Sequence, residues 1–206
     1  ESWWIMATAT VPRTLFLLDF DDTLFPTSWV TRFKPDVAGP VKTQEIQEQF
    51  KRYAAQLGTF LTNVHDLSDN VVVVTHSTPQ WIEHITDKLF ANPEFDDVRK
   101  GVQALRVVAV EHNKPKLATF ASLIDEHATC EAVFGMSDMA WDRTDFLAAC
   151  KERKVFCKHI AFVQAPSVDE LRHQLAQMNK VVREFVARRE HVDLRTVVTL
   201  HLPPIV

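Results

Sequence analysis

Short apolar runs alternate along the chain with stretches in which apolar residues recur every three or four positions. Because the runs are continuous rather than interleaved with polar residues, they are typical of parallel strands that are buried on both faces. This alternation predicts an α/β fold, a three-layer α/β/α sandwich around a mostly parallel sheet of five or more strands. The five runs cover residues 14–18, 70–74, 106–110, 132–134 and part of 155–163.

The stretches between the runs have helical spacing. Apolar residues from Ile46 to Leu67 predict one long amphipathic helix, and Thr78-Pro79 predicts the start of another, with Trp81, Ile85 and Leu89 on its apolar side. Two further helices are predicted over residues 115–124 and 141–150.

The C-terminal part begins with Ser167-Val-Asp-Glu170, a capping box that starts a long helix. Its apolar side runs from Val168 to Phe185 and is predicted to cover the sheet, with a seam for a partner helix as the alternative. Weak alternation over residues 192–202 predicts an added edge strand.

Composition narrows the class of protein. The chain has 206 residues, 46% of them hydrophobic, and a net charge of −4, which predicts a single domain whose C-terminal part, 167–206, packs on the rest of the chain or on a partner. Apolar runs far shorter than ~20 residues exclude a membrane span, and scattered lysines and arginines argue against nucleic acid. Three cysteines without a pairing pattern favour a reducing intracellular compartment, cytoplasmic or organellar, mitochondria included.

Carboxylates gather at the end of the first apolar run, at Asp19, Asp21 and Asp22. In a parallel sheet the carboxyl ends of strands are where ligands bind. Neighbouring carboxylates repel one another unless a cation compensates them, and their oxygen atoms suit Mg²⁺. A ligand site and a simple Asp-rich turn are both compatible with this segment taken alone.

Other polar side chains follow the later runs. Thr75 ends the second run, Lys114 and Lys116 follow the third, and Asp138 and Asp142 follow the fourth, four residues apart. Each of these has an ordinary explanation as a helix cap or a surface residue. Their order along the chain is more informative than any one of them.

That order resembles the haloacid dehalogenase (HAD) superfamily over residues 14–165. Asp19-Phe-Asp-Asp-Thr23 is similar to its first motif, Thr75 to its second, Lys116 or Lys114 to its third, and Ser137-Asp138 with Asp142 to its fourth. Three segments also resemble a group of HAD-like proteins from microbial eukaryotes: residues 24–29, 80–83 and 137–143.

Two of these matches leave alternatives. Lys114-Pro115 fits one form of the third motif, while Lys116 with Phe120 one helical turn later fits another, which we favour. The Gly-Asp of the fourth motif also aligns with Gly135-Met136, but Ser137-Asp138 keeps the carboxylate and its spacing to Asp142.

The resemblance implies a HAD-like Rossmannoid core and a Mg²⁺-dependent phosphatase that forms an aspartyl-phosphate. Asp19 would be the nucleophile and Asp21 the general acid and base, while Thr75 and Lys116, or Lys114, would bind the phosphate. Mg²⁺ would be held by Asp19, the main-chain carbonyl of Asp21, and Asp138, with Asp142 reaching it directly or through water.

The spacing of the motifs leaves only a minimal cap, because residues 24–69 and 76–113 are mostly used by the predicted helices. An open site is expected, covered by residues 25–40, a protein partner or a second copy, and able to take a phosphorylated macromolecule as substrate. The alternative is a catalytically silent subunit with a structural role in a larger assembly, which the low glycine count of four and the irregular fourth motif favour.

Overall fold

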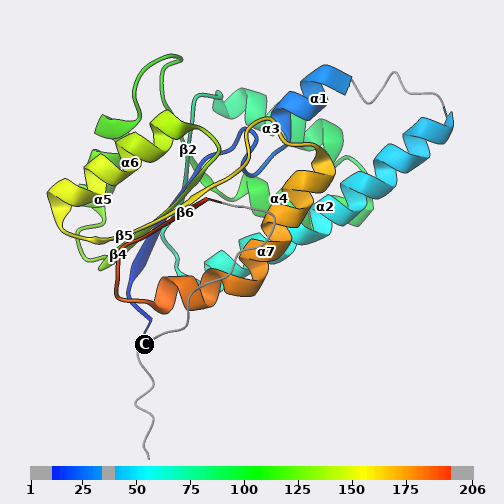
Figure 1. Cartoon of the computed structure of the whole chain (residues 1–206). Coiled ribbons are helices and arrows are strands. Elements are labelled where there is room, and N and C mark those ends of the chain that lie inside the picture. The colour runs from blue at the N-terminus through cyan, green and yellow to red at the C-terminus, as the bar shows by residue number, and fades with distance from the viewer. Residues whose placement is uncertain (1–10, 34–39, 196–206) are drawn as a thin grey trace, which may run out of the picture.

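The sheet has six strands, all parallel, in the order β3-β2-β1-β4-β5-β6. These come from a computed structural model that describes residues 11–33 and 40–195 (Figure 1). The strand order and the helices on both faces confirm the predicted three-layer, Rossmann-like α/β sandwich. The strands are β1 (Thr14–Leu18), β2 (Val71–Thr75), β3 (Arg106–Ala109), β4 (Ala132–Ser137), β5 (Phe156–Ala161) and β6 (Val192–Arg195).

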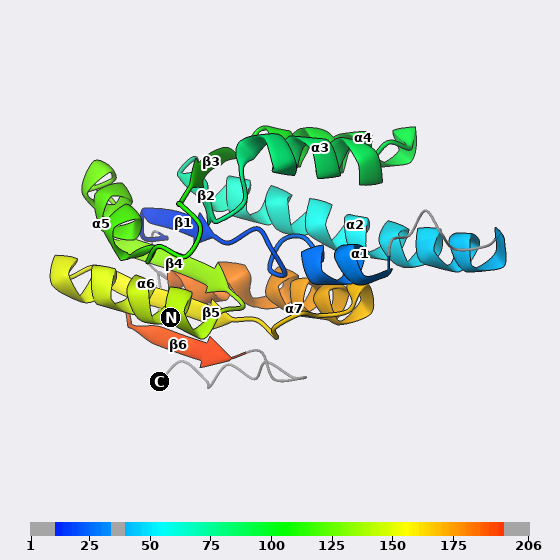
Figure 2. The same cartoon turned by 90° about the horizontal axis from the view of Figure 1, so that it is seen from above.

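Helices cover both faces of this sheet. On one face, α5 and α6 pack on β1 residues such as Leu15 and Leu17, and on the other α2, α3, α4 and α7 pack on residues such as Phe16 and Leu18 (Figures 1 and 2). The helices are α1 (Thr27–Phe33), α2 (Pro40–Leu67), α3 (Pro79–Leu89), α4 (Asp96–Gln103), α5 (Leu117–Glu126), α6 (Ala140–Arg153) and α7 (Val168–Ala187), with a short 3₁₀ turn, η2 (Pro93–Phe95).

The apolar runs of β1 and β2 form strands whose two faces are both covered, whereas the edge strand β3 has no buried residue. All five residues of β1 and of β2 are buried, as predicted for parallel strands inside such a sheet. The edge strand β6 begins where the tail was expected to add a strand, but only residues 192–195 of the predicted 192–202 lie within the described part of the chain.

Two predicted helical faces had different outcomes. The apolar side of α7 is fully buried within this chain, where it packs against α2 and the sheet, so it is not left open for a partner helix. The predicted stripe of α3 was wrong at Trp81, which is 38% exposed, because Ile82 faces the core beside Ile85 instead.

The last crossover differs from the others. Both β4–α6–β5 and β5–α7–β6 run toward the same edge of the sheet, but α6 and α7 lie on opposite faces, so the two connections have opposite hands. The first four crossovers share one hand, which by the general rule is right-handed.

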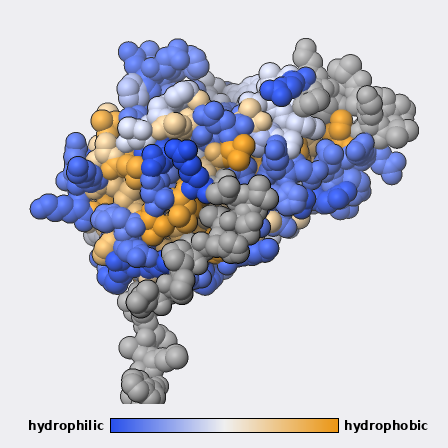
Figure 3. Space-filling view, in the orientation of Figure 1, coloured by the Kyte–Doolittle hydropathy of each residue, from blue (hydrophilic) through white to orange (hydrophobic). Residues whose placement is uncertain are grey.

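Apolar residues also gather on the surface over the β5–β6 edge, among mostly hydrophilic neighbours (Figure 3).

Within the described residues, we find no helix that combines the length and the apolar character needed to cross a lipid bilayer.

Candidate active site

The candidate site lies where the strand order reverses direction. β1 lies between β2 and β4, and the connections leave in opposite directions from this point, which opens a crevice at the carboxyl ends of the strands. Asp19 directly follows β1, and Asp138 directly follows β4. The main-chain N–H of Asp19 donates to the carbonyl of Met136 at 2.9 Å, which fixes the two strand ends side by side.

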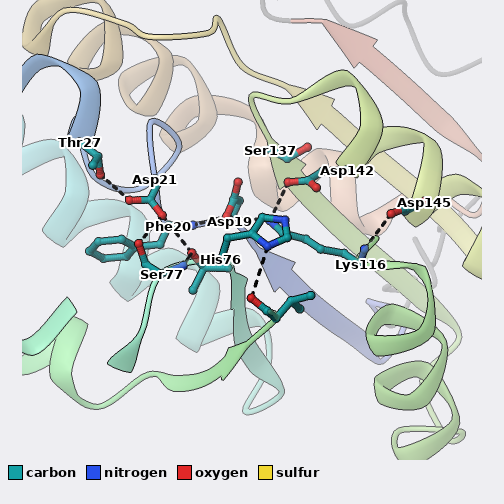
Figure 4. Close-up of polar contacts among 12 residues, drawn as sticks. Asp19, Phe20, Asp21, Thr27, His76, Ser77, Lys116, Ser137, Asp142 and Asp145 are labelled. Carbon is teal, nitrogen blue, oxygen red and sulfur yellow. Dashed lines mark hydrogen bonds and ion pairs between the residues drawn. The ribbon is translucent and has the colours of Figure 1, made fainter. Parts of the chain in front are cut away.

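A buried lysine joins the carboxylates at this edge. Nζ of Lys116 lies 3.0 Å from Oδ1 of Asp19 and donates a hydrogen bond to Oδ2 of Asp142 at 2.6 Å (Figure 4). The main-chain N–H of Lys116 donates to Asp145 at 2.8 Å, which fixes the start of α5. Lys116 is 1% exposed, whereas Lys114 is exposed in a neighbouring hollow, so of the two candidate lysines Lys116 reaches the carboxylates.

Burial dominates the electrostatics of the cluster. It raises the pKa of Asp19 to about 8, with the charges of Asp142 and Asp138 acting in the same direction and Lys116 opposing them. Burial and the charge of Asp22 raise the pKa of Asp138 to about 7. Burial alone would lower the pKa of Lys116, but the carboxylates of Asp19 and Asp142 outweigh it and raise that pKa. The single cation of Lys116 therefore does not keep both Asp19 and Asp138 fully ionised near neutral pH.

Asp21 is held by three hydroxyl groups. Oδ1 accepts a hydrogen bond from Thr27 at 2.6 Å, and Oδ2 accepts one from Thr75 at 3.0 Å and one from Ser77 at 2.7 Å (Figure 4). The donors come from α1, the end of β2 and the turn before α3. Thr75 thus contacts the second carboxylate of the first motif.

The loop that carries Asp21 is shaped by its own main chain. The carbonyl of Phe20 accepts hydrogen bonds from the N–H groups of Thr23, Leu24 and Phe25, and Asp22 adopts a left-handed φ of 55°. The Asp22 carboxylate accepts hydrogen bonds from the N–H of Ser28 at 2.9 Å and from its hydroxyl at 2.5 Å. Asp22 is therefore used to hold α1 against the loop.

The fourth motif is best matched by Ser137-Asp138. Gly135 lies inside β4, and a Cβ there would stand 2.6 Å from the Phe146 ring, so packing explains this glycine. The Ser137 hydroxyl lies 3.1 Å from Nε2 of His159, whose pKa burial lowers to about 4. A neutral His159 thus supports the end of β4 from the neighbouring strand.

The donor chemistry at the cluster fits a hard divalent cation. Oδ1 of Asp142 is buried and has no hydrogen-bond partner among the described residues, although an unpaired buried carboxylate oxygen is costly. Together with Asp19 and Asp138, it offers carboxyl oxygens of the kind that bind Mg²⁺. Among the described residues, no group of three or more His, Cys, Asp or Glu side chains is arranged so that it could hold a metal ion.

Comparisons of the chain with family models, curated proteins and solved structures find no match. The argument for function therefore rests on the arrangement of the site itself.

Some residues of the site were not foreseen. Thr27 and Asp145 contact site residues only because the loop after β1 and the start of α6 turn toward them, and no local pattern marks either one. His159 had a signal, since a polar residue in an apolar strand must find a partner. Trp141, next to Asp142, is exposed.

Proposed function

We propose that this chain is a Mg²⁺-dependent phosphatase in which Asp19 becomes transiently phosphorylated. The observation that supports it best is the buried contact of Lys116 with both Asp19 and Asp142 at the strand-order switch. A buried ion pair adds little net stability, because desolvation offsets most of its attraction. Shifted pKa values at the carboxyl ends of the strands, where α/β folds bind ligands, favour the interpretation of this cluster as a functional site.

In the proposed reaction, an oxygen of Asp19 attacks the phosphorus of a phosphate monoester. The new P–O bond to Asp19 forms as the P–O bond to the leaving alcohol breaks, and protonated Asp21 gives its proton to the departing oxygen. Asp21 then takes a proton from a water molecule, which attacks the aspartyl-phosphate and releases inorganic phosphate and free Asp19. Lys116 offsets the negative charge that the phosphate brings next to Asp19.

Mg²⁺ is part of the proposal. Asp19, Asp138 and the main-chain carbonyl of Asp21 would hold it, and the unpartnered oxygen of Asp142 adds a further ligand. When bound, the ion would neutralise the phosphate and the carboxylates around it, which otherwise repel each other.

We also propose that the site is open to large substrates. Between β1 and β2 the described chain forms α1 and α2, and α2 is committed to the core, where it packs on α7. Between β2 and β3 it forms α3, η2 and α4. These helices leave the carboxyl edge without a separate cap domain among the described residues, which suits a bulky phosphorylated substrate.

A catalytically silent subunit is the second candidate. It is favoured by the engagement of both oxygens of Asp21 with hydroxyl groups, and by the lack of a gathered metal centre among the residues that are described. A binding subunit of this kind would keep the ion pairs of Lys116 but would show no turnover.

Hydrolysis of 4-nitrophenyl phosphate separates the two candidates. We expect turnover with Mg²⁺, loss of turnover in excess EDTA, and a decrease in kcat of at least ~1,000-fold in Asp19→Asn. Asp66→Asn, which changes an exposed carboxylate far along α2, is the matched control and should keep the wild-type rate. Equal rates for wild type and Asp19→Asn would overturn the nucleophile, and no turnover in any protein would favour the silent subunit.

A further inference from the structure

A second hollow opens beside the candidate active site. It has a volume of about 440 Å³ and is lined by His76, His112, Lys114, Pro115 and Trp141, together with Asn113 and Asp145. This volume lies within the ~300–1,000 Å³ range of small-molecule sites. None of its lining residues takes part in the proposed phosphoryl transfer.

The residues of the hollow are chain neighbours of the active-site residues. His76 follows Thr75, Lys114 and Pro115 precede Lys116, and Trp141 precedes Asp142. Asp145 makes the link directly, since its carboxylate accepts the main-chain N–H of Lys116 at 2.8 Å (Figure 4). The hollow and the candidate active site are therefore built on the same chain segments and meet at Asp145.

The rings of Trp141, His76 and His112 line the hollow. Trp141 is 57% exposed, the most exposed of the large hydrophobic residues in the described ranges, so its indole is available for contact rather than used for packing. The rings of His76 and His112 lie 6.2 Å apart and nearly perpendicular, at 84°.

The His76 ring is held in place before any ligand arrives. Nδ1 of His76 lies 3.3 Å from the carbonyl of Val110 and 3.2 Å from that of Glu111 (Figure 4). Because carbonyl oxygens only accept hydrogen bonds, Nδ1 carries the hydrogen and the orientation of the ring is set. Asn113 takes a left-handed φ of 65°, which turns the segment before Pro115 along the hollow.

We propose that this hollow binds the leaving group of the substrate and that it selects a planar aromatic ring, which stacks on Trp141. Indole and imidazole faces favour flat π-systems over aliphatic chains, and Lys114 adds a cation that attracts a ring face or an acidic group. This inference rests on the proposed phosphatase function and specifies its substrate class: phosphate monoesters whose alcohol carries a ring. A phenol and a nucleobase share this chemistry.

Binding of matched phosphate pairs tests the proposal without turnover. Calorimetric titration of Asp19→Asn with Mg²⁺ compares phosphotyrosine with phosphoserine and AMP with ribose 5-phosphate, so that each pair differs by one ring system. We expect the ring-bearing member of at least one pair to bind about tenfold tighter, the size typical of one stacking contact. The pair that shows the difference identifies the source of the ring.

Two tryptophan variants in the same Asp19→Asn background locate the effect. Trp141→Ala should reduce the ratio within a pair to less than about twofold, while Trp81→Ala, which changes an exposed tryptophan outside the hollow, should preserve it. Unfolding curves check that both variants fold. Equal affinities within both pairs, no binding of any of the four phosphates, or a ratio that survives Trp141→Ala would overturn the proposal.

The outcome also separates this inference from the proposed function. Ring-selective binding without hydrolysis of 4-nitrophenyl phosphate by the wild type would retain the aromatic subsite and reject the phosphatase. Hydrolysis without ring-selective binding would retain the phosphatase and reject the subsite.

Discussion

Lys116 and Lys158 are both buried at the same sheet but have opposite surroundings. Lys116 lies among the carboxylates of Asp19 and Asp142, which raise its pKa. Lys158 on β5 donates to the main-chain carbonyls of Arg188 and Glu190 and lies 5.9 Å from the centre of the Phe185 ring. Carbonyls carry no net charge, so burial prevails and lowers the pKa of Lys158 to about 8.

The difference separates a structural lysine, Lys158, from the lysine that we propose to be functional, Lys116. Lys158 holds the turn between α7 and β6, at the end of the one crossover whose hand differs from the rest. Its ammonium group donates to main-chain carbonyls at the start of this turn, of which the bond to Arg188 is buried and the bond to Glu190 is partly buried. Lys116 instead belongs to a cluster in which three acidic side chains, Asp19, Asp138 and Asp142, share one buried cation, which folding alone does not require.

Among the changes that compare the two lysines, Lys116→Met is expected to have the largest effect. This change leaves buried carboxylates without their cation, so we expect kcat to fall at least ~100-fold and the metal-free protein to lose about 3 kcal/mol of unfolding free energy. Hydrolysis of 4-nitrophenyl phosphate and urea unfolding measure the two effects. Activity within a few-fold of the wild type would show that Lys116 is as structural as Lys158.

Lys158→Met should affect stability alone. Loss of its hydrogen bonds to two main-chain carbonyls should cost about 2 kcal/mol, while kcat stays within about twofold of the wild type. A large loss of activity in a folded Lys158→Met protein would remove the contrast between the two lysines.

The shifted pKa of Lys158 also predicts how the unfolding free energy of the wild type, relative to Lys158→Met, changes with pH. The folded-state pKa of Lys158, about 8, lies below the ordinary 10.5, so as pH falls from 10.5 to 8 the unfolded chain takes up the proton first. Wild-type stability therefore falls over this window relative to Lys158→Met, and their difference is constant below pH 8. Urea unfolding from pH 7 to pH 10.5 checks this, and a flat difference throughout would contradict it.

Ser77→Ala tests the hydroxyl groups around Asp21. Because Ser77 only positions the acid, we expect kcat to fall about tenfold, the pH profile of kcat to shift and KM to change little. Ser77→Thr keeps the hydroxyl and should restore most of the rate. Thr62→Ala, which removes an exposed hydroxyl bonded within α2, is the control. An unchanged pH profile would show that Asp21 is positioned without Ser77.

The smallest effect is expected for Lys114→Ala, two residues before Lys116. Lys114 is exposed and makes no contact with the site carboxylates, so the unfolding free energy should change by less than about 0.5 kcal/mol. A loss as large as that of Lys116→Met would mean that the two lysines exchange roles in solution.

Much of the fold could be predicted because apolar runs and caps are local signals. The boundaries of β1 and the capping box of Ser167 were both predicted correctly from neighbouring residues. The sequence favoured Lys116 over Lys114 because Phe120 follows one helical turn later, but the N–H contact of Lys116 with Asp145, 29 residues away, had no local signal. The hydroxyl groups around Asp21 depend in the same way on where α1 and β2 meet.

The acceptor of the phosphoryl group is the most direct test of the account. Wild-type protein is mixed with ³²P-labelled aryl phosphate and Mg²⁺, quenched in acid during turnover, and digested. The account predicts an acid-stable, alkali-labile label on the peptide that contains Asp19, and no label in Asp19→Asn. Steady turnover with the label on another residue, or with no labelled peptide at all, would contradict it.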